Sequence, residues 1–260
     1  MTSSETAGLQ YAVERGVAWI SLNRPEARNA LDRELRRALV AAVKQAARDR
    51  AARVIVIGGE GPAFCAGADV REMAGEDREP LEVVRADYEA LLTQLRTTPK
   101  PTIAAIRGAA AGIGVSIALS CDLRYATPDA FLREAFVDIG LTVDGGATWL
   151  LPRLVGSARA LELFYTGRRL PAEEAERWGV VNAIVPPDEL EARVRTVASQ
   201  LARGPAAALG AIKRSVAYAE TSTFEEALDF EFLLQGVQFT GSDFKEGTTA
   251  FLEKRRPHFS

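Results

Sequence analysis

The stretch Phe64-Cys65-Ala66-Gly67-Ala68-Asp69-Val70 decides the fold, together with Gly108-Ala109-Ala110-Ala111-Gly112-Ile113-Gly114 further along the chain. Each stretch follows an apolar run typical of a buried strand, at 54–57 and 102–106. Small residues let the backbone come close to a ligand and leave its N–H groups open to it. Two such donors, brought together at strand ends, can hold the negative charge that develops on a carbonyl oxygen. The sequence therefore predicts an enzyme whose main electrostatic device is its own main chain.

The composition is that of an ordinary globular protein, because 47% of the 260 residues are apolar and 26% are charged. The length allows one large domain, or one domain with a small appendage. A net charge of −3 gives no overall attraction to nucleic acid or to acidic membranes. The most membrane-like run, 108–121, is shorter than the roughly 20 residues that a span needs. We therefore expect no membrane segment.

Cysteine and histidine usage narrows the chemistry. Cys65 and Cys121 are too few for a disulfide framework, and the polar N-terminus lacks the order of a signal peptide, so we expect a cytoplasmic protein. His258 is the only histidine, which argues against Ser-His-Asp and Cys-His catalysis and against a His-rich metal site. Catalysis is expected to use carboxylates, backbone amides or another side chain.

Periodicity and turn residues predict strand–helix units followed by a helical last third. A hairpin is expected over 10–22, and Asp32 is placed to cap a helix that begins at Arg33. Further strands are expected at 54–57, 102–106, 122–126, 130–131 and 180–185. Helices are expected at 33–50, 81–96, 112–121, 147–155, 157–166, 172–178, 187–203, 205–220 and 224–239. The charged segment 71–80 has the composition of a mobile loop.

Several further segments match one known family in the same order as the two opening stretches. They are 23–25 with 29–31, 100–105, Cys121-Asp122, Gly140-Leu141, 151–156, 166–168, 175–181 and 246–257. Taken together, they make the chain resemble the enoyl-CoA hydratase/isomerase (crotonase) superfamily over nearly its whole length. The resemblance is closest to the isomerase-type members that have a single catalytic aspartate.

The resemblance implies an α/β fold of the ClpP/crotonase type, a spiral of ββα units. It implies a core domain over 1–198 and a helical C-terminal oligomerisation region over 199–260, which builds a trimer or a dimer of trimers. The implied ligand is an acyl-CoA thioester, with no cofactor other than the coenzyme A of the substrate and no metal.

The resemblance also implies the site residues. The oxyanion-hole amides carry over to Ala68 and Ile113, although many relatives have glycine at the second position. Contacts with coenzyme A are implied for Ala27, Arg28, Ala30, Ala66, Asp69, Val70, Gly114 and, from a neighbouring subunit, Lys254. Arg28 and Lys254 are expected to pair with phosphates, or else to be solvated surface charges. Tyr88, Leu91, Leu92 and Leu95 either line the acyl pocket or form a helix-packing face.

The acid and base groups distinguish the reactions of the family. Hydratases use two glutamates, and their positions here are Ser116 and Phe136, with Glu134 displaced by two residues. Asp144 lies in a segment that resembles the dienoyl-CoA isomerases and the bacterial phenylacetate-pathway isomerases, which keep an aspartate there as proton shuttle. A double-bond shift with Asp144 as catalytic residue is therefore favoured. Hydration of a 2-enoyl-CoA and non-catalytic acyl-CoA binding stay open, as does a turn or helix-cap role for Asp144.

Two other functions are less consistent with the sequence. Gly112-Ile113-Gly114 begins like a dinucleotide-binding fingerprint, but Ile117 stands where the third glycine is needed. One branch of the family binds RNA through a basic helix, and a basic stripe runs along 33–50: Arg33, Arg37, Lys44 and Arg48. Any solvated amphipathic helix shows such a stripe, so we expect no nucleic-acid partner.

Overall fold

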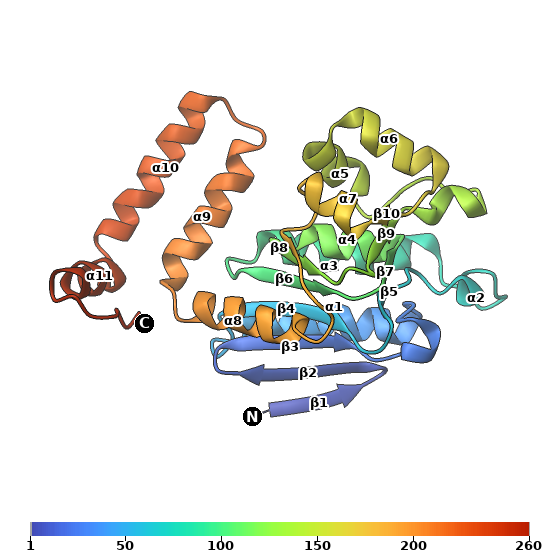
Figure 1. Ribbon diagram of the computed structural model, residues 1–260, viewed down its shortest axis with the longest axis horizontal. Coiled ribbons are helices and arrows are strands. Elements are labelled where there is room, and N and C mark those ends of the chain that lie inside the picture. The colour runs from blue at the N-terminus through green and yellow to red at the C-terminus, as the bar shows by residue number, and fades with distance from the viewer. Residues whose placement is uncertain (1, 260) are drawn as a thin grey trace.

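Two β-sheets organise the computed structural model, which describes residues 2–259 (Figure 1). The larger sheet has seven strands in the order β1-β2-β3-β4-β6-β8-β11. Strands β1 to β3 are antiparallel, and β3, β4, β6, β8 and β11 are parallel. Their bounds are β1 Thr2–Thr6, β2 Leu9–Glu14, β3 Val17–Leu22, β4 Val54–Gly59, β6 Thr102–Ile106, β8 Leu123–Ala126 and β11 Ala183–Ile184.

The smaller sheet has four short strands in the order β10-β9-β7-β5. Their bounds are β5 Ala63–Cys65, β7 Ala109–Ala111, β9 Phe131–Arg133 and β10 Leu170–Pro171. Strands β5, β7 and β9 are parallel, and β10 is antiparallel to β9. Parallel strands leave a sheet at the same edge, so the segments that follow Cys65, Ala111 and Arg133 emerge side by side.

The helices lie mainly outside the sheets, apart from the apolar helix α4. The first group is α1 Arg33–Arg48, α2 Val70–Met73, α3 Leu81–Thr97, α4 Ile113–Ser120, α5 Ala147–Val155, α6 Ser157–Thr166 and α7 Ala172–Arg177. The second is α8 Leu190–Ala202, α9 Ala206–Ala219, α10 Phe224–Phe239 and α11 Ser242–Leu252, with short 3-10 turns η1 Pro25–Ala27 and η2 Ala135–Ile139. As expected, Asp32 caps α1 by accepting a hydrogen bond from the amide of Leu35 at 2.9 Å.

Alternation along the central strands explains why both faces of the large sheet are covered. On β4, Val54 and Val56 belong to the apolar cluster beneath α8, whereas Ile55 and Ile57 belong to the main core. Successive side chains of a strand point to opposite faces, and all four are buried. A parallel sheet buried on both faces is expected to be rich in valine and isoleucine, as this one is.

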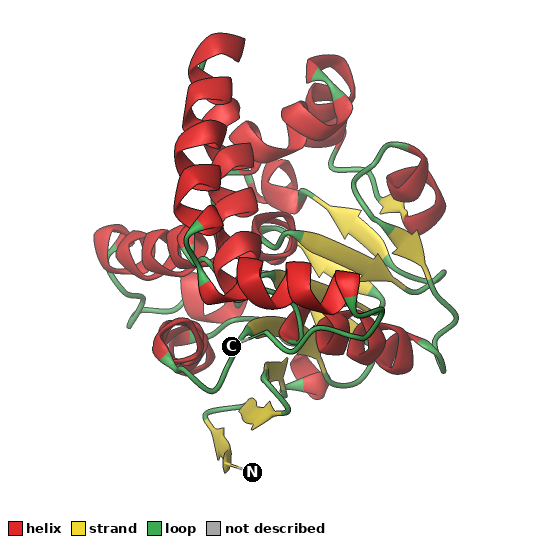
Figure 2. Ribbon diagram, turned by 90° about the vertical axis from the view of Figure 1, so that its left-hand side faces the viewer, coloured by secondary structure: helices red, strands yellow, loops and turns green. Residues whose placement is uncertain are grey.

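The C-terminal helices α9, α10 and α11 project beyond the sheets and lie in front of the strands in Figure 2. Helix α9 is anchored by the ammonium group of Lys213, which binds the carboxylate of Asp122 at 2.9 Å and the carbonyl of Leu95 at 2.8 Å. Large apolar side chains are exposed along the three helices: Ile212, Val216, Tyr218, Phe224, Leu228, Phe232, Leu233, Val237, Phe239, Phe244, Phe251 and Leu252. No helix within residues 2–259 is long and apolar enough to cross a membrane.

Candidate active site

The two glycine-rich loops that were identified in the sequence pack against each other. Gly67 has a φ of +97°, and a Cβ built on it would lie 2.9 Å from the carbonyl oxygen of Ala111. A Cβ on Gly114 would lie 2.5 Å from the carbonyl oxygen of Cys65. Glycine is therefore needed at both positions because the neighbouring backbone takes the space of a side chain.

The amides of Ala68 and Ile113 lie in these touching loops. Neighbouring amides are bonded, since Leu31 N donates to Gly67 O at 2.8 Å and Asp69 N donates to Leu31 O at 3.0 Å. Within the described residues, the amides of Ala68 and Ile113 themselves donate no hydrogen bond. Ile113 begins α4, where amides have no partner inside the helix and the helix dipole favours negative charge.

The turn that holds Asp144 packs directly on the first turns of α4. A Cβ on Gly145 would lie 2.4 Å from Cδ1 of Ile113 and 2.6 Å from Oγ of Ser116. The Ser116 hydroxyl donates to the carbonyl oxygen of Asp144 at 3.5 Å. The branched side chain of Ile113 is thus buried under this turn, and Asp144 is fixed beside the start of the helix.

Asp144 is an exposed residue, yet the protein around its carboxyl group raises its pKa through partial desolvation. No described side chain binds this carboxylate. The ring of Phe136, at the second hydratase position, lies close to Gly112, whose Cβ would be 3.7 Å from Cζ. An apolar ring and the buried hydroxyl of Ser116 therefore occupy the two positions at which the family resemblance implies the carboxylates of hydratases.

Two further polar groups belong to this region, although the sequence did not single them out as catalytic. Glu134 is 3% exposed, and burial followed by the charge of Asp144 raises its pKa to about 8. Tyr88 is buried, and desolvation raises its pKa, with Arg36 opposing the shift and Cys65 and Asp144 adding to it. Leu91 and Leu95 are fully buried, so this part of α3 is a packing face.

The segments proposed to contact coenzyme A lie next to each other. Ala66 N donates to Arg28 O at 3.0 Å, which joins the 27–30 loop to the 66–70 segment. Asp69 pairs with Arg24 at 3.5 Å and caps α2 through the amide of Arg71 at 3.1 Å. The side chain of Val70 is exposed, as is that of Arg28.

Lys254 does not lie with these segments. It follows α11, which stands at the opposite end of the molecule from α2 (Figure 1). Its proposed contact accordingly requires a neighbouring subunit.

Asn29 connects the 24–30 loop to the small sheet, although only the family resemblance drew attention to it. It is fully buried, and its Oδ1 accepts a hydrogen bond from Arg24 N at 2.8 Å. Its Nδ2 donates to the carbonyl oxygens of Glu60 at 3.0 Å and Ala63 at 2.7 Å. One side chain therefore holds the loop against the strand that leads into Ala66–Ala68.

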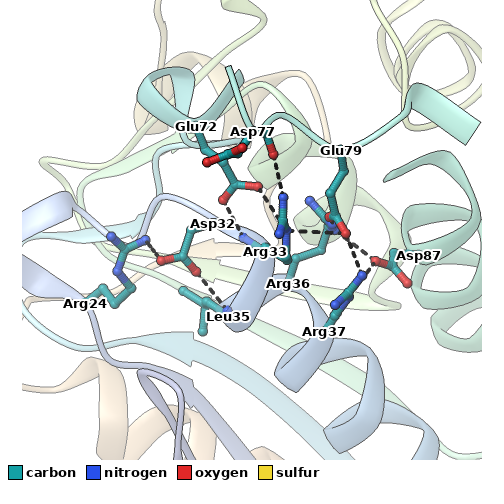
Figure 3. A network of polar contacts seen from close by, with 10 residues as sticks. All are labelled: Arg24, Asp32, Arg33, Leu35, Arg36, Arg37, Glu72, Asp77, Glu79 and Asp87. Atoms are coloured by element: carbon teal, nitrogen blue, oxygen red, sulfur yellow. Dashed lines mark hydrogen bonds and ion pairs between the residues drawn. The ribbon is translucent and has the colours of Figure 1, made fainter. Parts of the chain in front are cut away.

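An ion-pair network fastens the charged segment 71–80 to α1 (Figure 3). Glu79 binds Arg36 and Arg37, and Arg36 also binds Asp87 at 3.0 Å. Glu72 accepts a hydrogen bond from the amide of Arg33 at 2.7 Å. Two of the four basic-stripe residues, Arg33 and Arg37, are thereby paired with acids of the same chain. The segment read as a mobile loop contains α2 and is tied down at both ends.

Side chains that commonly bind metals do not form a metal centre in the part of the chain that the structure describes. Across residues 2–259, no group of three or more His, Cys, Asp or Glu side chains is arranged to hold a metal ion.

Comparison with known proteins agrees with this fold. Residues 12–260 match the profile of the enoyl-CoA hydratase/isomerase family. The chain is 42% identical over 252 residues to a probable enoyl-CoA hydratase of Rhodobacter capsulatus, covering 97% of each chain. It is 38% identical over 252 residues to the 1,2-epoxyphenylacetyl-CoA isomerase of Escherichia coli, covering 95% of this chain and 96% of that one. An enoyl-CoA hydratase structure from Geobacillus kaustophilus has a TM-score of 0.91 at 39% identity, covering 99% of each chain.

The fold is thus the crotonase fold, with mixed sheets and a helical C-terminal region. The chain belongs to the enoyl-CoA hydratase/isomerase family and is an enzyme that acts on acyl-CoA. The family and the fold expected from the sequence are confirmed.

Proposed function

We propose that this enzyme shifts a carbon–carbon double bond of an enoyl-CoA, with Asp144 as the proton shuttle. The observation that supports this most strongly is the packing of the Asp144–Gly145 turn on Ile113 and Ser116 at the start of α4. The turn that carries this carboxyl group, whose pKa is raised, thus packs on the start of α4, where the amide of Ile113 is unpaired. A relative with 38% identity is named an isomerase.

The proposed reaction needs one carboxylate and two amides. The carboxylate of Asp144 removes a proton from the α or γ carbon, and the electron pair moves into conjugation with the thioester. The amides of Ala68 and Ile113 bind the oxygen on which the negative charge develops, and each such donor is worth about 10²–10³ in rate. Return of a proton to the other carbon completes the shift. The pKa of Asp144, which desolvation raises, suits this group to both steps.

Hydration is less well supported because both glutamate positions of the hydratases are changed. Ser116 is a buried hydroxyl, and Phe136 presents an aromatic ring near Gly112. Neither can take a proton from a water molecule as a carboxylate does.

We further propose that coenzyme A lies along Ala27, Arg28 and Ala30 and along the segment Ala66, Asp69 and Val70, with Gly114 behind the thioester. The exposed apolar residues of α9 to α11 support a homo-oligomer, a trimer or a dimer of trimers, because patches of this extent usually mark an interface. A neighbouring copy would then supply Lys254. Light scattering in solution tests the assembly, and a monomer at micromolar concentration would contradict it.

Heavy-water assays test the reaction. Wild type, Asp144→Asn and the exposed control Asp129→Asn are incubated with 3-hexenoyl-CoA and crotonyl-CoA, and products are analysed by mass spectrometry. We expect wild type and Asp129→Asn to isomerise the 3-enoyl thioester, and Asp144→Asn to lose about 10²–10⁴ in rate. Hydration of crotonyl-CoA without isomerisation, or full activity of Asp144→Asn, would overturn the proposal. A non-catalytic binder would neither isomerise nor exchange protons.

A further inference from the structure

Glu134 is a buried carboxyl group without a partner. It is 3% exposed, and neither Oε1 nor Oε2 has a hydrogen bond to any described residue. The other buried charged side chains, Arg36 and Arg124, are both hydrogen-bonded. A buried polar group that lacks a partner is costly, and such groups are concentrated at functional sites.

The cations near Glu134 are committed elsewhere. Arg133 and Arg168 line the same small hollow as Glu134, together with Leu132, Leu151, Leu163 and Leu170. The guanidinium of Arg133 donates to the carbonyl of Gly167 at 2.7 Å and pairs with Asp138 at 2.5 Å. That of Arg168 pairs with Glu162 at 2.6 Å and with Glu174 at 2.8 Å.

The charge environment of Glu134 keeps it neutral. Burial and the negative charge of Asp144 raise its pKa to about 8, and no cation offsets them. Glu134 therefore holds a proton at neutral pH.

The small sheet places Glu134 at the edge from which the loops of the proposed reaction centre leave. Glu134 follows β9, and β5 and β7 end at the same edge and lead to Ala68 and Ile113. The residue before it accepts a hydrogen bond at its carbonyl from Gly112 N at 2.9 Å. Glu134 is therefore one residue from a direct backbone link to the loop of Ile113.

We propose that Glu134 is a second proton carrier of this site, which delivers a proton to the dienolate while Asp144 removes one. This rests on the isomerisation proposed above. Asp144 takes the substrate proton, and the C–H electron pair passes into the dienolate held by the two amides. Glu134 then gives its proton to the other carbon, whose new C–H bond is formed by the dienolate electrons. Glu134 is left as a carboxylate. The proton that Asp144 took from the substrate then passes to Glu134, so both groups regain their starting protonation states without another reactant.

The source of the proton that reaches the product tests the proposed roles of Asp144 and Glu134. Enzyme equilibrated in heavy water carries deuterium on Glu134, so a single turnover of 3-hexenoyl-CoA places one solvent deuterium in each product molecule. In Glu134→Gln, Asp144 is the remaining carrier, and within a single turnover it returns mainly the proton that it took from the bound substrate. We expect the rate to fall about 10²-fold and the product to lose most of its solvent deuterium. A side chain that acts only through packing would change the rate without changing the deuterium content.

The controls separate this proposal from the one on which it rests. The exposed Glu173→Gln should keep both the wild-type rate and the deuterium content. If Glu134→Gln folds poorly, Glu134→Leu applies the same test in a hollow already lined by leucines. If wild type isomerises and the variant product contains as much deuterium as the wild-type product, Glu134 is not the donor and the role of Asp144 stands. If wild type does not isomerise, the proposed function itself fails.

Discussion

Replacement of Asn29 by alanine should destabilise the protein strongly, because three hydrogen bonds and an unusual backbone conformation meet at one buried residue. The side chain joins Arg24, Glu60 and Ala63 through bonds of 2.7 to 3.0 Å. Each such bond contributes about 1 kcal/mol. Asn29 also has a φ of +57°, a left-handed conformation that asparagine tolerates and that costs alanine about 1 kcal/mol. The expected loss for Asn29→Ala is about 4 kcal/mol.

Thermal unfolding monitored by circular dichroism measures this loss. At about 2–4 °C per kcal/mol for a domain of this size, Asn29→Ala should melt roughly 10 °C below wild type. Asn29→Gly removes the same bonds, but glycine adopts a positive φ without strain. It should therefore be about 1 kcal/mol more stable than Asn29→Ala and melt a few degrees higher. The control Asn182→Ala loses only the bond from Arg124 N at 2.7 Å. A melting temperature for Asn29→Ala within about 2 °C of wild type would refute the reasoning.

Two other predictions concern the site. Because the pKa of Glu134 lies at about 8 in the fold against 4.5 in the unfolded chain, its contribution to stability is complete below about pH 4.5 and is lost as the pH rises toward 8. Glu134→Gln should therefore gain stability relative to wild type between pH 5 and pH 8, and urea midpoints that keep a constant difference would contradict the raised pKa. Gly114→Ala should lower turnover by about 10²-fold, because its Cβ would lie 2.5 Å from the Cys65 carbonyl and must displace a loop that carries a proposed donor. Gly236→Ala, whose Cβ meets nothing within 4 Å, should leave turnover unchanged, and equal activity of the two variants would show that the loop tolerates the clash.

Helices whose apolar periodicity extends over several turns could be predicted from the sequence. Helix α1 begins after Asp32 as expected and ends at Arg48, and α5, α6 and α10 have the expected bounds. The two- and three-residue strands β5, β7 and β10 were missed because such lengths show no periodicity and depend on pairing between distant segments. The strand expected over 180–185 shortens to β11, since Val180 N and Val181 N bond to Ala175 O in the turn after α7. Strand β1 and helix α11 were not foreseen.

The site was predictable in part, for a similar reason. Ala68 and Ile113 lie in touching loops, as two glycine-rich stretches after strands suggested. Glu134 was set aside because motif alignment pointed to position 136, and only the pairing of β9 with β7 shows that residue 134 leaves the sheet beside Gly112. The available sequence signal for Glu134 was an acidic residue two positions after the short apolar run Ala130-Phe131-Leu132. The burial of Arg36 could not be predicted from the sequence. An arginine on the apolar side of a helix is explained only once its ion-pair partners, Glu79 and Asp87, are known.

The edge where β5, β7 and β9 end has an evolutionary consequence. A peptide N–H persists through every substitution except proline, so the charge-stabilising part of such a scaffold is inherited whatever side chains drift around it. The positions proposed to carry protons, 134 and 144, and the two positions aligned with hydratase glutamates, 116 and 136, are ordinary side chains that a single codon change can exchange. New chemistry on this frame therefore requires a few local replacements and no new architecture. Relatives that share about two fifths of their residues with this chain can accordingly be named hydratase in one organism and isomerase in another.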